Sequence, residues 1–240
     1  MNYKENQFVQ LPTRESKENS DLIPEEEYVY LGLKSFYNES DKKCNPSYER
    51  LSERLKIKST KTIKKYIDSL ENKGYIKVLR GKYKTSNQYF FIKELDGFEK
   101  FSYAFFENDI LNSSLKAFVA AIQRLMYINQ DTGIGNITFQ PLEISKKLNV
   151  SLSITNKRMK DLEKLGMMEV YKTNTKDLQT GLLKNLYQFN LSKYNPIVKV
   201  LINHEERIQE NTNDIAELKE RMNILEEENK KYKKRYGIII

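Results

Sequence analysis

The stretch that decides the fold is residues 45–79, which read NPSYERLSERLKIKSTKTIKKYIDSLENKGYIKVL. A helix start at Asn45-Pro46-Ser47 opens it, Ser59 can cap a second helix after a short turn, and Gly74 ends that helix. Apolar residues recur at helical spacing through both segments: Leu51, Leu55, Ile63, Ile67 and Leu70. The stretch therefore predicts two short amphipathic helices joined by a tight turn.

The flanking segments extend this pattern in both directions. Upstream, Pro24 and three glutamates suit the first turn of another helix, because proline is tolerated there and acidic side chains complement the positive helix end. Downstream, residues 75–80 and 89–92 are rich in aromatic and β-branched residues around a basic polar tip, which indicates a β-hairpin. Helix, helix, turn, helix and hairpin together predict a winged helix-turn-helix.

The same order of elements returns later in the chain. A helix from about Ser114 to Ile128, a short strand from Asn136 to Phe139, helices beginning at Pro141 and Ser151, and a hairpin of residues 167–172 and 185–191 are predicted. The residues repeat too: Leu51, Ser52, Leu55 and Ile57 match Ile144, Ser145, Leu148 and Val150, and an Asn-x-Tyr-x-Phe occurs at both Asn87 and Asn185. These matches in one order indicate an internal repeat.

The last segment, residues 197–236, changes to heptads that no Gly or Pro interrupts. Its periodicity predicts a parallel coiled coil that makes the protein a homodimer, with opposite charges paired between positions e and g. The residues expected in the seam are Leu201, Ile208, Ile215, Leu218, Met222, Leu225, Asn229 and Tyr232. The predicted fold class is mainly α with small β-hairpins: two tandem winged helix-turn-helix domains followed by a long C-terminal coiled-coil helix.

The predicted domain boundaries follow from these patterns. Residues 1–22 are expected to be a flexible arm with one docking point at Phe8 to Pro12, because the rest of the arm is polar. Residues 23–98 and 99–194 are the two winged helix domains, and residues 197–236 are the dimerisation helix.

Charge is unevenly distributed along the chain, which has a formal net charge of +8. Residues 56–84 carry ten Lys and Arg against two acidic residues, and residues 146–184 carry nine against four. Two separate basic blocks in an otherwise neutral or acidic chain indicate surfaces for a polyanion, and nucleic acid is the commonest such partner.

Several function classes lack the residues they need. With one cysteine, Cys44, and one histidine, His204, the chain offers no disulfide, no metal cluster and little material for a nucleophile and base pair. No signal peptide or stretch of about 20 apolar residues is present. The sequence therefore predicts a cytoplasmic, non-enzymatic protein with neither cofactor nor metal nor membrane contact.

The first predicted domain resembles the winged helix of bacterial plasmid and phage replication initiators. The similarity rests on residues 23–26, 45–51 and 59–76, together with the Phe8 to Pro12 lead-in, and it covers roughly residues 8–95 with a weaker echo from Phe105 to Leu191. The resemblance implies DNA binding and initiation of plasmid or phage replication. A transcriptional regulator of a mobile element is an alternative, and so is a structural or adaptor protein that does not bind DNA.

The candidate DNA-binding residues lie on the third helix of each predicted domain and in the hairpins. Thr60, Lys61, Lys64 and Lys65 would enter the major groove, while Ser47 and Tyr48 at the preceding helix start would meet a phosphate. Hairpin tips would follow the backbone or the minor groove. The full set is Ser47, Tyr48, Ser59, Thr60, Lys61, Lys64, Lys65, Arg80, Lys82, Lys84, Asn156, Lys157, Lys160, Lys176 and Lys184. Expected partners are double-stranded DNA and replication or transcription proteins.

Overall fold

A computed structural model describes residues 8–12, 21–82, 85–92, 98–129, 134–176 and 183–190. The chain divides into two compact units, Met1–Lys199 and Val200–Ile240, and all described residues belong to the first. The predicted coiled coil, residues 197–236 with Leu201, Ile208, Ile215, Leu218, Met222, Leu225, Asn229 and Tyr232, lies outside the described residues.

The described residues form seven helices and eight strands, so the fold mixes helices with small antiparallel sheets. The helices are α1 (Pro24–Lys34), α2 (Tyr48–Leu55), α3 (Thr60–Asn72), α4 (Tyr103–Glu107), α5 (Ser113–Gln123), α6 (Pro141–Lys147) and α7 (Leu152–Lys164). The strands are β1 (Phe8–Pro12), β2 (Ile76–Leu79), β3 (Gln88–Phe91), β4 (Phe98–Ser102), β5 (Tyr127–Asn129), β6 (Ile134–Ile137), β7 (Met168–Lys176) and β8 (Leu183–Asn190).

The first repeat, residues 21–92, contains α1, α2, α3 and the β2–β3 hairpin. Ser47 caps α2 by accepting the Arg50 N–H at 3.2 Å, and Ser59 caps α3 by accepting the Thr62 N–H at 3.3 Å. The turn between them begins at Lys56, whose φ of 53° reverses the chain. The helices predicted from residues 45–79 are therefore confirmed, with their caps.

Helix α1 is buried on every side, as is the eleven-residue α5 of the second repeat. Its apolar residues 28–33 surround the helix axis, and a helix segment of this kind belongs in a core rather than at a surface. Its Gly32 permits the close approach of α2, because a Cβ there would lie 2.7 Å from a side-chain atom of Leu55. Helix α1 thus forms the centre of the first repeat and leaves α2 and α3 on its outside.

The second repeat, residues 113–190, follows the same order with a larger sheet, in which the strands run β5-β6-β8-β7. The predicted helix from Ser114 to Ile128 ends early at Gln123, so this prediction was wrong at its C-terminal end. The reason is that Tyr127 and Ile128 leave the helix to pair with Asn136 and Gly135 of β6. The predicted hairpin strands are present and extend further toward their turn than the pattern indicated.

The two repeats agree in backbone detail. Lys56 and Asn149 both have φ of 53° at the turn before α3 and α7, and Gly74 and Gly166 both have positive φ after those helices. In the first repeat Cys44 forms a β-bridge with Tyr89, and in the second Ile137 pairs with Tyr187 at the matching place. The internal repeat seen in the sequence is therefore present in the backbone.

Residues 98–107, which lie between the repeats, form a strand and a helix, β4 and α4. Strand β4 pairs antiparallel with β1 of the N-terminal arm, and α4 follows directly. Their aromatic residues are buried against α1: the Phe105 ring meets the Tyr28 ring edge-on at 6.1 Å, and the Phe106 ring stacks on it at the same distance. The expected docking point of the arm is thus a strand.

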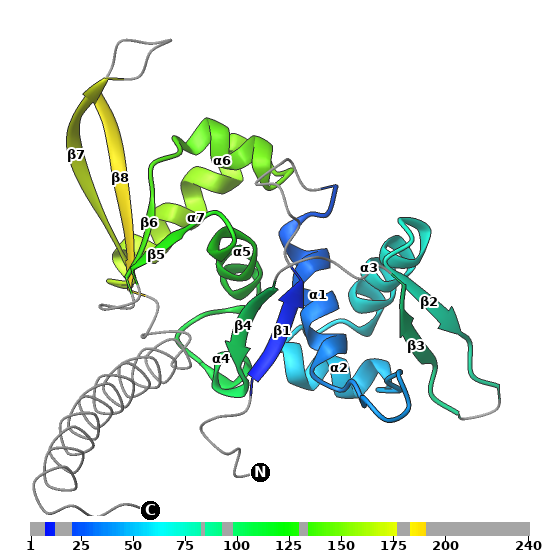
Figure 1. Ribbon diagram of the computed structural model, residues 1–240. Helices are drawn as coiled ribbons and strands as arrows, with labels where there is room; N and C mark the ends of the chain where they lie inside the picture. The colour runs from blue at the N-terminus through cyan, green and yellow to red at the C-terminus, as the bar shows by residue number, and fades with distance from the viewer. Residues whose placement is uncertain are drawn as a thin grey trace, which may run out of the picture. The chain divides into compact units, whose positions relative to one another are not determined.

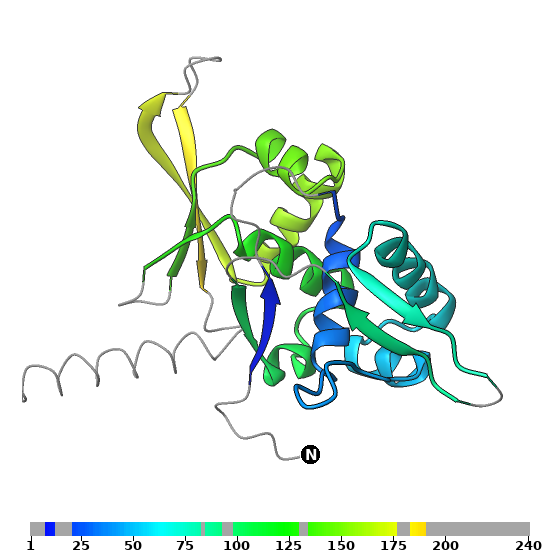
Figure 2. The ribbon, with the colours of Figure 1, turned by 45° about the vertical axis from the view of Figure 1, so that its right-hand side comes forward.

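Figures 1 and 2 show how the helices are arranged. Helix α1 lies between α3 of the first repeat and α5 of the second, and the β2–β3 and β7–β8 hairpins project at opposite ends. The first helices of the two repeats therefore pack against each other and share one core.

Candidate nucleic-acid interface

The outer face of α3 carries three exposed lysines, Lys61, Lys64 and Lys65. The opposite face buries Ile63, Ile67 and Leu70 completely, so packing of the apolar face fixes which way the lysines point. Thr60, at the first position of the helix, is half-buried, and Ser59 is exposed at the cap. The structure therefore brings the candidate residues of this helix together on one solvent-facing surface.

The described helices differ in the charge of their first turns, and α3, α4, α5 and α7 have no acidic residue there. Helices α1, α2 and α6 place glutamates in their first turns, which complements the positive end of the helix dipole. Helix α3 has no acidic residue there and instead carries Lys61. A lysine at this place costs stability, and it adds its charge to the positive helix end. The positive helix end together with the Lys61 charge is suited to binding an anion.

Arg80, a candidate in the hairpin, is occupied by acidic side chains of α3. Its guanidinium contacts the Asp68 carboxylate at 3.0 Å and the Glu71 carboxylate at 2.6 Å. Glu71 also accepts the Val78 N–H at 2.9 Å, which ties the hairpin to the helix. Arg80 thereby offsets one of the two negative charges of Asp68 and Glu71, and the lysines of α3 keep most of their excess charge.

Asn87 joins the hairpin to the N-terminus of α2. Its side-chain amide donates to the Tyr48 hydroxyl at 2.9 Å and to the Tyr89 hydroxyl at 3.3 Å, and its oxygen accepts the Gly81 N–H. Burial is the main cause that raises the pKa of Tyr89, so its hydroxyl stays protonated as part of the hairpin core. These bonds fix the base of the hairpin against the helix-turn-helix.

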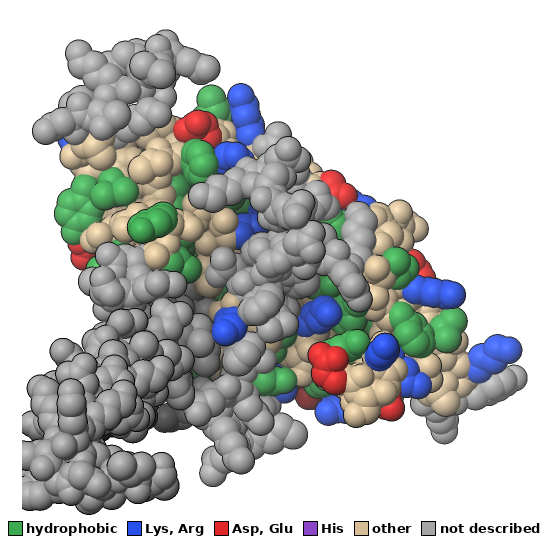
Figure 3. Space-filling view, viewed as in Figure 1, with side chains coloured by type: hydrophobic (Ala, Val, Ile, Leu, Met, Phe, Trp, Pro, Cys, Tyr) green, Lys and Arg blue, Asp and Glu red, His purple; other side chains and the backbone are tan. Residues whose placement is uncertain are grey.

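The remaining cations of the first basic block divide into paired and unpaired groups. Lys56 pairs with Asp109, and Lys73 pairs with Glu26 at 2.7 Å. Among the described residues, no ion pair involves the exposed side chains of Lys58, Lys61, Lys64, Lys65, Lys77 and Lys82. Lys58 and Lys77 belong to the basic block but were not predicted as site residues. In Figure 3, Lys and Arg side chains flank the β2–β3 hairpin.

These features define the first repeat: two capped helices joined by a reversing turn, the second of them basic on its outer face. Residues 21–76 match a family described as a helix-turn-helix domain. A search of curated proteins finds no match to the chain. The helix-turn-helix assignment agrees with DNA as the partner of this region.

Two other properties concern the described part of the chain as a whole. No described helix combines the length and the apolar character that crossing a membrane requires. The described residues also contain no group of three His, Cys, Asp or Glu placed to hold a metal ion.

The second repeat presents a weaker version of the basic face. Asn156, Lys157 and Lys160 are exposed on α7, as expected for the counterpart of α3. However, Leu152 and Ile154 are 41% and 43% exposed at its N-terminal turn, where α3 has Thr60 and Thr62. Lys176 and Lys184 lie in the hairpin strands, but their side chains, like the whole of Lys84 and Tyr83 in the first hairpin, lie outside the described residues.

Glu25, Glu26 and Glu27 of α1 each contact a different helix, which the sequence pattern did not indicate. Glu25 pairs with Arg158 of α7, Glu26 pairs with Lys73 just after α3, and Glu27 pairs with Arg124 just after α5. The Glu26 carboxylate also caps the helix, by accepting the Ile23 N–H at 3.0 Å. Capping therefore explains only part of this acidic run. The signal that could have found the rest is the apolar run of residues 28–33, which surrounds the helix axis: an acidic residue on a helix buried in this way needs a partner.

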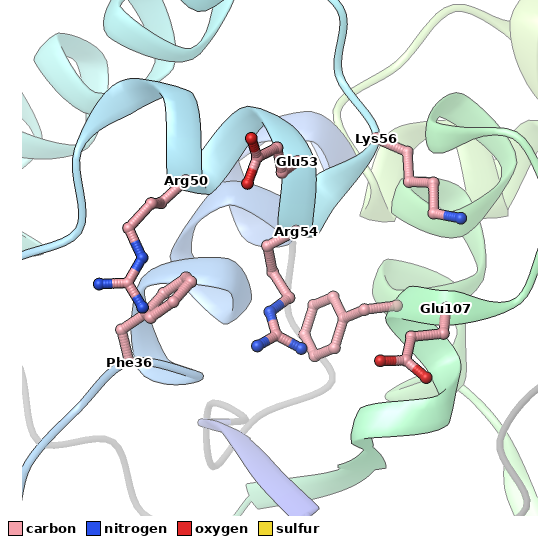
Figure 4. A pocket seen from close by; sticks show the side chains of 7 residues that line it. Phe36, Arg50, Glu53, Arg54, Lys56 and Glu107 are labelled. Atoms are coloured by element: carbon pink, nitrogen blue, oxygen red, sulfur yellow. The ribbon is translucent and has the colours of Figure 1, made fainter. Parts of the chain in front are cut away.

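A pocket of about 260 Å³ lies between α2 and α4. Figure 4 shows Arg50 and Arg54 extending into it side by side from α2. The Arg54 guanidinium lies 5.3 Å from the Phe36 ring centre and 5.8 Å from that of Phe106. Glu53 and Glu107 line the same pocket and balance its arginines, so it has less excess charge than the α3 surface.

Proposed function

We propose that the protein binds double-stranded DNA in a sequence-specific manner through two winged helix-turn-helix units, with α3 as the main recognition helix. The observation that carries the proposal is the outer face of α3, where Lys61, Lys64 and Lys65 are exposed beside a helix end with no acidic residue. A major groove admits one α-helix, and exposed side chains on that helix can meet base edges.

Each group of residues has a distinct part in this proposal. Lys61 and Lys64 meet the major groove, where lysine donates to guanine acceptors. Ser59 and Thr60 stand at the same end of the helix. Ser47 and Tyr48 contact a phosphate near the N-terminus of α2, and Lys82 and Lys84 follow the backbone from the hairpin. Arg80 holds the hairpin in place through Asp68 and Glu71, and its charge is already shared.

The second unit is proposed to bind a second half-site with a weaker base readout than that of α3. Asn156, Lys157 and Lys160 face solvent on α7, but the apolar Leu152 and Ile154 replace the polar residues of α3 at its start. Asn156 can meet an adenine edge, while Lys157 and Lys160 neutralise phosphates and strengthen binding to every sequence alike.

For the biological process, we propose initiation of plasmid or phage DNA replication, which rests on the resemblance of residues 23–76 to such initiators. A transcriptional regulator of a mobile element would use the same surface. The position of the bound DNA site decides between them, since an initiator binds repeated sites at an origin and a regulator binds across a promoter.

Dimerisation is proposed to occur through the heptads of residues 197–236. Truncation after Tyr194 should give monomers in sedimentation velocity, because the seam from Leu201 to Tyr232 is then absent. Dimers that persist after this truncation would contradict the coiled coil as the dimer interface.

Selection of bound fragments from random duplex DNA tests the proposal directly, and the selected site then becomes the probe. Lys61→Ala with Lys64→Ala should weaken binding to this site more than to random DNA. Lys82→Ala with Lys84→Ala should weaken both equally. Equal losses from both pairs on every sequence would contradict groove reading by α3, and failure to enrich any sequence would contradict specific binding.

A further inference from the structure

We infer that the glutamates of α1 are positioning residues that hold α3 and α7 at one separation, so that the protein accepts only DNA sites whose two half-sites have one spacing. The inference rests on the proposed function, because it requires both helices to bind the same DNA. It restricts the spacing between the two half-sites in the DNA, which neither helix alone would restrict.

The contact of Glu25 with Arg158 connects the two repeats directly. Arg158 lies in the middle of α7, and its side chain turns inward to the Glu25 carboxylate instead of outward with Lys157. Its guanidinium also donates to the Ser114 hydroxyl at 2.9 Å and lies 5.6 Å from the Phe118 ring centre, both on α5. Arg158 therefore fixes α7 to α1 and α5 at once.

A second buried ion pair connects the repeats through the helix that precedes α7. The Arg124 guanidinium lies 3.2 Å from the Glu27 carboxylate and donates to the Lys147 carbonyl, at the end of α6, at 3.2 Å. Both side chains of this pair are less than 10% exposed. The helix-turn-helix of the second repeat is thus tied to α1 at α6 and at α7.

Glu26 completes the connection on the side of the first repeat. Its carboxylate accepts the Ser69 hydroxyl at 2.6 Å and pairs with Lys73, so α3 is held to the same turn of α1. Charges from both repeats act on Tyr66 of α3. Burial raises the pKa of Tyr66 most, the Glu25 and Glu26 charges raise it further, and the Arg158 charge lowers it. One helical turn therefore positions α3 and α7 together.

Charges with little access to water make this connection stiff, and the Glu27–Arg124 pair is the most buried of the three. A carboxylate and a guanidinium taken out of water depend on each other, so sliding one repeat past the other would leave both charges unpaired in a low-dielectric core. Three consecutive residues on a helix point about 100° apart, so the three contacts restrain α1 in different directions. A flexible tandem of domains, by contrast, would tolerate several half-site spacings.

Distance measurement between spin labels tests the positioning itself. Labels at Asn72→Cys and Lys164→Cys, both exposed near the C-terminal ends of α3 and α7, would be placed in the full chain carrying Cys44→Ser. We expect one narrow distance distribution, and a broad one in the variant Glu25→Gln with Arg158→Met, whose folding is checked by circular dichroism. Glu143→Gln is the matched control, since Glu143 makes its capping bond to the Gln140 N–H inside the second repeat. A broad distribution in the parent chain would overturn the inference.

DNA with altered spacing tests the consequence. Each base pair inserted between the half-sites of the selected site turns one half-site by about 34° relative to the other. Insertion of two base pairs should weaken binding at least about tenfold in the parent chain, and less in the Glu25 and Arg158 double variant. Equal affinity for all spacings would overturn the inference while leaving DNA binding intact. Absence of binding to any duplex would contradict the proposed function, and with it the inference that only one half-site spacing is accepted.

Discussion

Replacing Lys61 by glutamate should stabilise the protein and weaken its DNA binding at the same time. Lys61 stands in the first turn of α3 and is exposed, with Ser59 as the cap and Lys65 four residues ahead. In the isolated protein its positive charge is repelled by the positive end of the helix dipole. On DNA the same charge contributes to binding. The two effects of Lys61→Glu therefore have opposite signs.

The magnitudes follow from the position of the residue. Exchanging an unfavourable for a favourable charge at the helix end is worth about 1 kcal/mol in the free energy of unfolding. A glutamate four residues before Lys65 adds about 0.3 kcal/mol. For binding, loss of one cation that displaces a counterion from DNA costs about eightfold in affinity at 0.1 M salt, and the new negative charge costs about as much again, giving about 60-fold.

Urea denaturation and fluorescence anisotropy with labelled duplex DNA measure the two quantities on the same preparations. Ser153→Glu is the matched control, because Ser153 holds the same second position in α7 after the Ser151 cap. It should stabilise by the dipole effect and weaken binding less than Lys61→Glu. Destabilisation by Lys61→Glu, or unchanged affinity for DNA, would refute the assignment of Lys61.

Two further predictions concern the core and the hairpin. Burial lowers the pKa of the Lys116 ammonium from 10.5 to about 8, where it donates to the Phe106 carbonyl. Between these values Lys116 binds fewer protons in the folded state than in the unfolded chain, so this residue contributes a rise in the free energy of unfolding as the pH rises from about 8 to about 10. Cys44 opposes this rise above pH 9, because burial raises its pKa from 9.0 to about 12. Lys116→Met should remove this rise, and a rise of equal size in that variant would contradict it. Asn87→Ala should cost about 2 kcal/mol through its three hydrogen bonds, and Asn185→Ala less, since its described bond is to Tyr187 alone. Equal losses of unfolding free energy from the two variants, measured by urea denaturation, would count against Asn87 as the residue that fixes the base of the first hairpin.

The sequence predicted the elements whose signals are local. Caps at Ser59 and Ser151, the glycines after α3 and α7, and the spacing of buried leucines all act within one or two turns of chain. The direction of the α3 lysines followed from the same periodicity, because the apolar face determines where the polar face points.

The features that the sequence did not predict depend on distant partners. The helix predicted to reach Ile128 ends at Gln123, because pairing with β6 competes with continuation of the helix. Strand β4 and helix α4 carry apolar residues without a clear period, and their burial depends on α1 and β1. Arg80 counts as a cation in the sequence, and only the folded hairpin brings it to Asp68 and Glu71.

The salt dependence of affinity for duplex DNA tests the central claim most directly. Six exposed lysines surround α3 and the β2–β3 hairpin, Lys58, Lys61, Lys64, Lys65, Lys77 and Lys82. If all six displace counterions from the DNA, log affinity should fall with log salt at a slope of about 5 per bound chain. Replacing Lys61, Lys64 and Lys65 by Gln should reduce this slope by about 3, whereas Lys56→Gln should leave it unchanged, because Lys56 is paired with Asp109. A slope near zero, or one that the triple variant does not alter, would contradict DNA binding through α3.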